Sequence, residues 1–93
     1  MADPPTSLRL DKFLWFARIV KTRALAQAMA EGGHLRLNGR PIAQAHAPVR
    51  VGDTLTFAQR GAVRVLRVEA LPIRRGPSPE ARACYVEPSG EAE

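Results

Sequence analysis

Basic side chains in the first half of the chain stand at or beside predicted joints between helices and strands. Six of these cations are Arg9, Lys12, Lys21, Arg23, Arg36 and Arg40. Two neutral donors accompany them, because the hydroxyl group of Thr22 lies in the Lys-Thr-Arg run and the amide of Asn38 lies in an Asn-Gly turn. Cations bind phosphates by charge, and hydroxyl and amide groups add hydrogen bonds to phosphates or bases. The pattern therefore predicts a surface for a polyanion.

The sequence contains no arrangement of residues that is typical of an enzyme or a metal site. Cys84, His34 and His46 do not form the ligand clusters that structural zinc sites use. The glycine pair at 32–33 follows a predicted helix, whereas a nucleotide-binding loop needs its glycines before one. Asp11 stands among basic residues, so we expect it to form a structural ion pair that orients an arginine. We predict no catalytic residue, no cofactor and no metal ion, and we expect Cys84 to be a small buried side chain.

Charge is distributed unevenly along the chain. The 93 residues carry a net charge of +5 at pH 7, with an isoelectric point near 10.7. Nine Lys or Arg and three acids lie between Leu8 and Arg60, whereas Glu80–Glu93 holds one Arg and four Glu. A basic body with an acidic end indicates a polyanionic partner for the body. No apolar run approaches the roughly 20 residues of a membrane span, and the N-terminus lacks the features of a secretory signal, so we expect a cytoplasmic monomer without a membrane partner.

Two helices are predicted to position the first four cations. The first is expected over residues 8–20, capped by Thr6 or Ser7, because one stripe at helical spacing contains Leu10, Phe13, Leu14, Ala17 and Val20. Thr22 is a good N-cap for a second helix over residues 23–31, which the glycine pair at 32–33 ends in a left-handed conformation. The residues of this second helix that are expected to face inward are Ala24, Leu25, Ala28 and Met29.

Short strands are predicted after the second helix. Residues 34–37 and 40–43 flank Asn38-Gly39, the strongest short signal for a tight hairpin, and Pro41 favours an edge position. Further strands are expected at 49–51, 54–59 and 62–71, the last with a bulge or a twist where the alternation slips at Leu66. A short helix is expected from Ser78 to about Val86. If the helix corner and the hairpin lie on one side, Arg9 and Lys12 complete a continuous basic surface.

Several of these motifs occur together in a fixed order. They are Arg9-Leu10-Asp11-Lys12-Phe13-Leu14, Arg18, Lys21-Thr22-Arg23-Ala24, Gly32-Gly33, Leu37-Asn38-Gly39 and Val51-Gly52-Asp53-Thr54-Leu55. In this combination, over roughly residues 8–59, the chain resembles the S4 RNA-binding domain family. Its Trp15 context, the run 21–26, Arg74-Arg75 and the segment 79–85 resemble the small ribosome-associated heat-shock proteins of that family.

This resemblance implies an α+β fold of the S4 (αL) type, in which two N-terminal helices pack on a small, mostly antiparallel sheet of about four to five short strands, followed by a short C-terminal helix. It implies RNA binding by the helix corner and first hairpin through Arg9, Lys12, Lys21, Thr22, Arg23, Arg36, Asn38 and Arg40. The implied partners are ribosomal RNA and peptidyl-tRNA on the large ribosomal subunit, in the recycling or rescue of subunits that carry a stalled nascent chain. Longer members continue into a basic extension, and we expect its contacts to be absent here.

The expected organisation is a flexible N-terminus at 1–7, an S4-like domain at 8–71, and a C-terminal segment at 72–93 with the short helix and a disordered acidic tail. Alternative functions are a general binder of structured RNA in ribosome assembly or translation regulation, and a DNA-binding regulator of the helix-turn-helix type. The second predicted helix is mostly alanine with Gln27 exposed, which is a poor set for reading a major groove. Trp15 and Phe16 could instead anchor a protein partner, but Trp15 more simply covers the core edge.

Overall fold

The computed structural model describes residues 6–87, so the predictions for residues 1–5 and 88–93 lie outside the described residues. The elements are, in order, β1 (Leu8–Arg9), α1 (Leu10–Phe16), α2 (Arg23–Glu31), β2 (Leu35–Leu37), β3 (Arg40–Ile42), β4 (Pro48–Val49), β5 (Thr54–Gln59), β6 (Ala62–Val68), α3 (Ser78–Arg82) and β7 (Tyr85–Val86). None of the helices in this part of the chain has the length and apolar character needed to cross a membrane.

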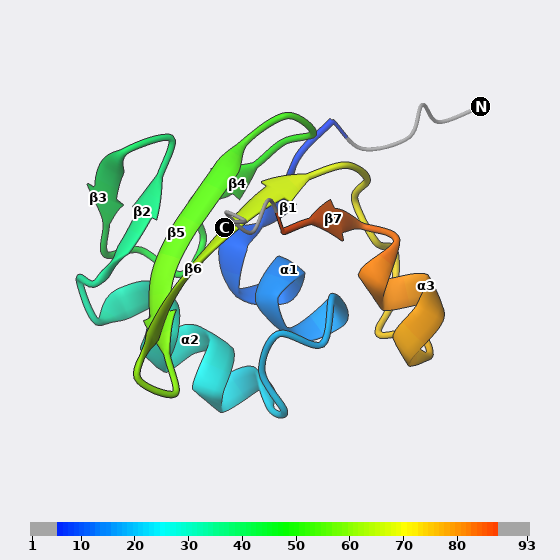
Figure 1. Cartoon of the computed structure of the whole chain (residues 1–93), viewed down its shortest axis with the longest axis horizontal. Helices are drawn as coiled ribbons and strands as arrows, with labels where there is room; N and C mark the ends of the chain where they lie inside the picture. Colours follow the sequence, from blue (N-terminus) through cyan, green and yellow to red (C-terminus); the bar gives the residue numbers. More distant parts are fainter. Residues whose placement is uncertain (1–5, 88–93) are drawn as a thin grey trace.

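The main sheet has five antiparallel strands in the order β3-β2-β5-β6-β7, and β1 pairs with β4 in a separate two-stranded ribbon. Helices α1 and α2 lie together against this sheet, and α3 lies beyond β7 (Figure 1). This arrangement is the α+β fold that the sequence predicts. The antiparallel order follows from the short turns at 38–39 and 60–61, because a parallel pair would need a long crossover.

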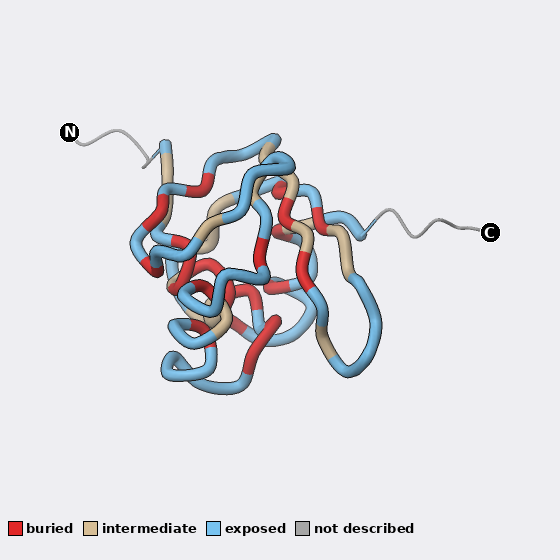
Figure 2. Tube along the Cα trace, turned by 90° about the vertical axis from the view of Figure 1, so that its left-hand side faces the viewer, coloured by how far each residue is buried: buried red, intermediate tan, exposed pale blue. Residues whose placement is uncertain are grey.

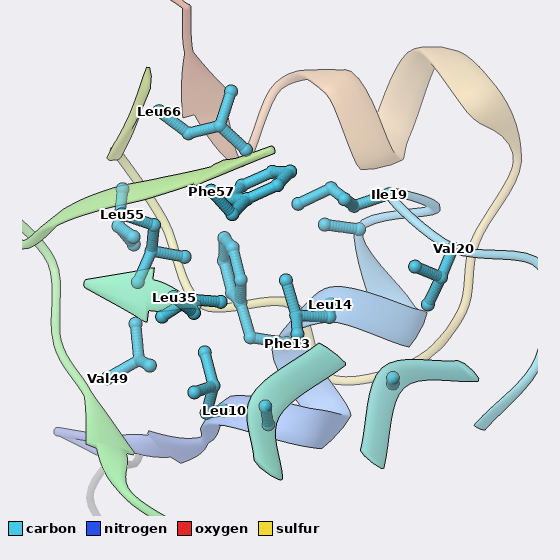
Figure 3. Packing of buried hydrophobic residues seen from close by; sticks show 14 of the residues in the cluster. Leu10, Phe13, Leu14, Ile19, Val20, Leu35, Val49, Leu55, Phe57 and Leu66 are labelled. Carbon is cyan, nitrogen blue, oxygen red and sulfur yellow. The ribbon is translucent and has the colours of Figure 1, made fainter. Parts of the chain in front are cut away.

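The core lies between α1 and one face of the sheet. Phe13 is fully buried in the centre of it, near Leu14, Leu35 and Phe57 (Figure 3). Register explains which residues join it: Leu55 lies opposite Leu37 and Leu66, so alternate residues of β2, β5 and β6 point toward the helices. Buried stretches run through the interior, whereas the connecting turns are exposed (Figure 2).

The first helix is shorter than predicted, although its apolar stripe is buried as expected. Leu8 and Arg9 pair with Val49 and Pro48 as a strand, so the N-cap is Arg9 rather than Thr6 or Ser7, and no side chain caps the helix. The helix ends at Phe16 because Arg18 takes a left-handed φ of 59°. The chain then turns back, and the amides of residues 19 and 20 donate to the carbonyl group of Leu14.

The second helix has the predicted bounds and the predicted cap. The hydroxyl oxygen of Thr22 accepts a hydrogen bond from the Leu25 amide at 3.1 Å. Its inward face was predicted only in part: Met29 packs half-buried against the core as predicted, but Leu25 is 51% exposed, and the fully buried residues are Ala26 and Ala30. Alanines on several faces of one helix give little contrast between apolar sides, so the pattern alone did not fix its rotation.

The remaining turns follow the sequence closely. Asn38 and Gly39 have φ values of 53° and 83°, as a two-residue hairpin with both central residues left-handed requires. Pro41 lies on β3, which is an edge strand of the main sheet, as predicted. Gly33 has a φ of 80° and follows the end of α2, which confirms the left-handed stop.

The predicted bulge in β6 is wrong. Pairing between β5 and β6 runs without a slip from Thr54↔Arg67 to Gln59↔Ala62. The alternation seemed to break because a charged residue, Arg64, occupies a position on the face that packs on the helices, while Val63 is 72% exposed. Arg64 tolerates this position because its guanidinium group lies 5.8 Å from the Phe57 ring centroid and reaches the sheet margin.

The C-terminal part contains one strand that the sequence did not predict. Helix α3 begins after Pro77 and ends at Arg82, instead of continuing to about Val86. Tyr85 and Val86 then form β7, which pairs with Val68 and Arg67 of β6. The strand was missed because a two-residue run has no periodicity of its own.

Candidate nucleic-acid interface

The start of α2 combines two cations with free backbone donors. Lys21, Thr22 and Arg23, which we call the basic corner, are all exposed. The Thr22 side chain and carbonyl group accept from the amides of Leu25 and Ala26, which leaves the first two helical amides without an intrahelical acceptor. The first turn of α2 contains no acidic residue. The basic corner is therefore an electropositive helix N-terminus with two flexible cations beside it.

A second group of predicted residues lies at the start of α1. The Arg9 side chain donates to both carboxylate oxygens of Asp11, at 3.1 and 3.0 Å, and the Lys12 amide donates to the same carboxylate at 2.8 Å. Asp11 is completely buried, whereas the Arg9 side chain remains 45% exposed. This arrangement confirms the expected structural ion pair, and it fixes Arg9 while leaving part of its surface accessible. Lys12 is half-buried and has no acidic partner among the described residues.

The third group lies on the β2–β3 hairpin. Asn38 uses its side chain within the fold: its amide nitrogen donates to Asp53 at 3.0 Å, and its oxygen accepts from the Thr54 amide at 2.9 Å. Arg40 is opposite Leu37 in the ladder, whereas Arg36 is opposite Pro41. Cross-strand partners point to the same face and neighbours alternate, so the two arginines emerge from opposite faces of the hairpin. Both are exposed, and because β3 is an edge strand, a ligand against this edge can reach both.

These three groups are separated in space by the helices that connect them. In Figure 1 the loop before α2 lies at the bottom, the β2–β3 hairpin at the left and the start of α1 near the centre. The nine residues of α2 correspond to a length of about 14 Å between the basic corner and the segment that leads into β2. The basic positions are therefore spread along α1, α2 and the hairpin, so a partner that contacts all of them must span at least the length of α2.

Most of the predicted cations lack the acidic partners that several arginines of the second half have within residues 6–87. Among residues 6–87, no acidic side chain pairs with Lys12, Lys21, Arg23, Arg36 or Arg40. In contrast, Arg64, Arg67 and Arg74 pair with Glu87, Glu69 and Glu80 at 2.8–2.9 Å. Acids of the second half thus pair with three of its arginines, whereas these five cations keep an unpaired charge within the described residues.

Two further exposed arginines near these groups were not included in the predicted site. Arg50 belongs to the turn that Asn38 holds, since its amide donates at 2.8 Å to the Asp53 carboxylate that also binds the Asn38 side chain. Arg60, at a left-handed φ of 55°, lies in the β5–β6 turn. The sequence offers a signal for both, because each arginine lies beside a turn that contains a glycine. Only the folded chain, however, shows which of these turns approach the helices.

An apolar groove connects Arg60 to the basic corner. It has a volume of about 530 Å³ and runs between α2 and the end of the β5–β6 hairpin. Lys21 and Arg60 both line it, together with the exposed Leu25 and the half-buried Met29 of α2. No acidic residue lines this groove. The structure thus adds a cation from a distant part of the sequence to the surroundings of Lys21.

Trp15 and Cys84, which the sequence analysis also singled out, belong to the core or its edge. Trp15 is half-buried against the core, and its ring lies 5.6 Å from that of Phe16, so its role at the core edge is confirmed. Cys84 is buried as predicted, and burial, together with the charge of Glu80, raises the pKa of its thiol. Within residues 6–87, no three His, Cys, Asp or Glu side chains lie close enough together to hold a metal ion.

Comparisons with known proteins give consistent matches. The S4 domain family model matches residues 8–55. Heat shock protein 15 of Escherichia coli K12 is 40% identical over 90 residues, which cover 97% of this chain and 67% of that protein. The RQC P-site tRNA stabilizing factor of Bacillus subtilis is 45% identical over 55 residues, 57% of this chain and 63% of that protein. The solved structure of trimeric heat shock protein 15 from Vibrio cholerae superposes with a TM-score of 0.81 at 38% identity, covering 87% of this chain and 81% of that one.

Proposed function

The chain belongs to the S4 domain family, and on this premise we propose that it is a non-catalytic protein that binds folded RNA. The proposed contacts are made by the eight predicted residues, Arg9, Lys12, Lys21, Thr22, Arg23, Arg36, Asn38 and Arg40. Of these, Asn38 acts mainly through the backbone that its side chain holds, because both polar atoms of its amide are already engaged. Arg60 and Arg50 extend the surface at its two ends.

The observation that carries this proposal is the basic corner. Two exposed cations flank two free amides at a helix N-terminus, and no acidic side chain in residues 6–87 pairs with either cation. Phosphates meet both the charge and the hydrogen-bonding needs of such a site. An acid in the first turn of α2 would stabilise the helix but would repel phosphate, and none is present there.

We propose that the RNA is part of the large ribosomal subunit or the tRNA bound to it, in the recycling or rescue of subunits that carry a stalled nascent chain. Two relatives support this choice by name, since one is a heat shock protein and the other stabilises a tRNA in the P site. A cytoplasmic location follows from the same proposal, because ribosomes act there.

The proposed mechanism is passive binding. Cations separated by the length of α2 match phosphates of a folded RNA whose shape brings its backbone to both the basic corner and the hairpin edge. Each neutralised phosphate releases counterions, so the affinity should fall as salt is raised. The major groove of an RNA helix is too deep and narrow for side chains to read, so recognition of a folded RNA should depend on its shape more than on its sequence.

The direct test reverses the charge of the basic corner. We expect Lys21→Glu/Arg23→Glu to abolish cosedimentation with isolated large subunits, because it replaces two phosphate-binding cations with repelling anions. Removing the two contacts should also reduce the slope of log affinity against log salt by about one for each cation. The matched control is Arg67→Glu/Arg74→Glu, which makes the same change in net charge at exposed positions that pair with acids. Unchanged cosedimentation of the first variant, or equal loss in both, contradicts the proposal.

A second candidate is a general binder of structured RNA in ribosome assembly or translation regulation. It is favoured by the composition of the surface, because unpaired arginines and lysines contact phosphates without reading sequence. Competition separates the candidates: ribosomal RNA should displace the bound probe well below the concentration needed for an unrelated RNA duplex. Displacement by duplex DNA as readily as by RNA would instead favour a DNA-binding regulator.

We propose that the RNA-binding unit is the monomer, since every residue of the proposed surface comes from one copy of the chain. The Vibrio cholerae relative is described as trimeric, so the state of this chain must be measured directly. Light scattering should give the monomer mass of about 10 kDa over a wide concentration range. A stable trimer mass at low concentration would show that assembly is part of its function.

A further inference from the structure

The basic corner is held by a residue from a distant part of the sequence. Residues 17–22 connect α1 to α2 without regular structure, and Arg18 in this loop has a left-handed φ of 59°, which side chains rarely adopt. Such a conformation persists only where surrounding contacts determine it. Besides the hydrogen bonds from the amides of residues 19 and 20 to Leu14, these contacts come from Arg75 and Gly76, more than fifty residues further along the chain.

Arg75 joins the two ends of this loop. One of its terminal guanidinium nitrogens donates to the carbonyl group of Trp15 at the end of α1 and, at 3.1 Å, to the carbonyl group of Val20. The guanidinium carbon lies 5.6 Å from the centroid of the Trp15 ring, so the group also covers that ring. Arg75 therefore adds a side-chain bridge between the carbonyl groups of Trp15 and Val20.

A reciprocal contact completes the connection. The Arg18 side chain donates through Nε to the carbonyl group of Gly76 at 2.5 Å, so each segment donates to the other. Gly76 is buried, and a Cβ there would come within 2.2 Å of the Glu80 carboxylate, which pairs with Arg74. The position of the 74–76 segment is thus set by α3 on one side and by the loop on the other.

The cost of this arrangement is electrostatic. Burial, together with the nearby charge of Arg18, lowers the pKa of Arg75 below its ordinary value. An apolar residue at position 75 would avoid this cost but could donate no hydrogen bond. Each terminal nitrogen of a guanidinium group carries two hydrogens, so one nitrogen of Arg75 can donate to both carbonyl groups.

We propose that Arg75 is a positioning residue for RNA binding: by bridging Trp15 and Val20 it fixes the loop that carries Lys21 and the Thr22 cap of α2. Lys21 directly follows the bridged residue, and Thr22 follows Lys21. Without this bridge, the basic corner would no longer have a fixed orientation, and the first turn of α2 would become more mobile. This inference rests on the proposed function, because it assigns Arg75 a role in the same corner without contact with the RNA.

The test compares Arg75→Ala with Arg74→Ala, a neighbour that loses the same charge but pairs with Glu80 instead of the loop. Amide hydrogen exchange by NMR reports the order of the corner without any RNA, and binding to isolated large subunits is measured well below the melting temperature. We expect Arg75→Ala to lose protection at the amides of residues 25 and 26 and to bind about tenfold more weakly, while Arg74→Ala matches the wild type in both.

Arg75→Met provides the second variant, since it keeps an unbranched apolar stem but cannot donate to either carbonyl group. We expect it to bind as weakly as Arg75→Ala. Full affinity in Arg75→Met would overturn the proposal, because the bridging hydrogen bonds would then be dispensable. Wild-type exchange at the corner in Arg75→Ala would overturn it as well. If Lys21→Glu/Arg23→Glu still binds normally while Arg75→Ala loses exchange protection, the proposed function fails and the positioning role at the corner remains.

Discussion

Replacing Asn38 separates a structural role from an RNA contact. Its side chain makes two hydrogen bonds, to Asp53 and to the Thr54 amide, and its backbone holds a left-handed φ of 53°. An exposed hydrogen bond contributes about 0.5 kcal/mol or somewhat more to stability, so the pair contributes about 1 kcal/mol. Alanine at a left-handed position costs about 1 kcal/mol more than a residue that tolerates it.

Two substitutions separate the contribution of the hydrogen bonds to stability from that of the backbone conformation. We expect Asn38→Gly, which keeps the conformation and loses the bonds, to lower the free energy of unfolding by about 1 kcal/mol, and Asn38→Ala to lower it by about 2 kcal/mol. For a domain of this size these losses correspond to Tm decreases of about 5 and 10 °C. Thermal and urea unfolding, followed by far-UV circular dichroism, measure both.

Arg40 is the matched control in the same turn. Its exposed side chain makes no hydrogen bond or ion pair within residues 6–87, so Arg40→Ala should leave Tm unchanged while weakening RNA binding. A wild-type Tm for Asn38→Gly would refute the role of the side-chain bonds. Equal stability of the Gly and Ala variants would refute the role of the backbone conformation.

Three further predictions concern the core and its margin. Asp11→Ala should lower the free energy of unfolding by about 2 kcal/mol, because it removes the buried carboxylate that accepts from Arg9 and from the Lys12 amide; urea unfolding measures the loss. The hydrogen bond from Arg64 lowers the pKa of Glu87 below its ordinary 4.5, so this pair should stabilise the fold above about pH 4.5 and lose its contribution as pH falls through the lowered pKa. The effect should be below about 1 kcal/mol, since both groups are partly exposed, and Glu87→Gln should flatten the acid limb of a plot of Tm against pH. Because burial raises the pKa of its thiol, Cys84 should resist alkylation near pH 8 in the folded protein and react fully in urea, which mass spectrometry detects; rapid labelling without denaturant would contradict its burial.

Features with strong local chemistry were predictable from the sequence. Thr22 places a cap where a helix begins, Asn38-Gly39 can form few structures other than a left-handed turn, and Pro41 cannot occupy a central strand. In each case one or two residues determine the backbone by themselves. These local signals predicted short helices and strands, and the family resemblance implied the α+β fold in which the helices pack on the sheet.

Features set by distant contacts were not predictable. The apolar stripe on α2 was assigned inward, but Ala26 and Ala30 are the fully buried residues of this helix, which packs on α1, and nothing in a run of alanines identifies this side. The alternation in β6 suggested a bulge because a sequence pattern cannot show that Arg64 has Phe57 beneath it and Glu87 beside it.

The candidate site was predictable in its residue types and only partly in its geometry. The basic corner is adjacent in sequence, so its three residues had to lie together. Arg36 and Arg40 are also close in sequence, yet the register of the hairpin turns them to opposite faces. Arg60 and Arg75 approach the corner from the sheet and from the C-terminal segment, and only tertiary structure shows these approaches.

The two outer strands of the main sheet have a consequence for solubility. Unpaired backbone at a sheet margin can recruit a strand of another molecule and begin aggregation. On one margin Pro41 removes a donor from β3, and Arg40 places a charge beside it; on the other, β7 extends over only two residues. Over residues 6–87, neither margin offers a long template for strand addition. Pro41→Val should therefore lower the concentration at which the protein forms fibrillar aggregates, although the fold itself would tolerate the change.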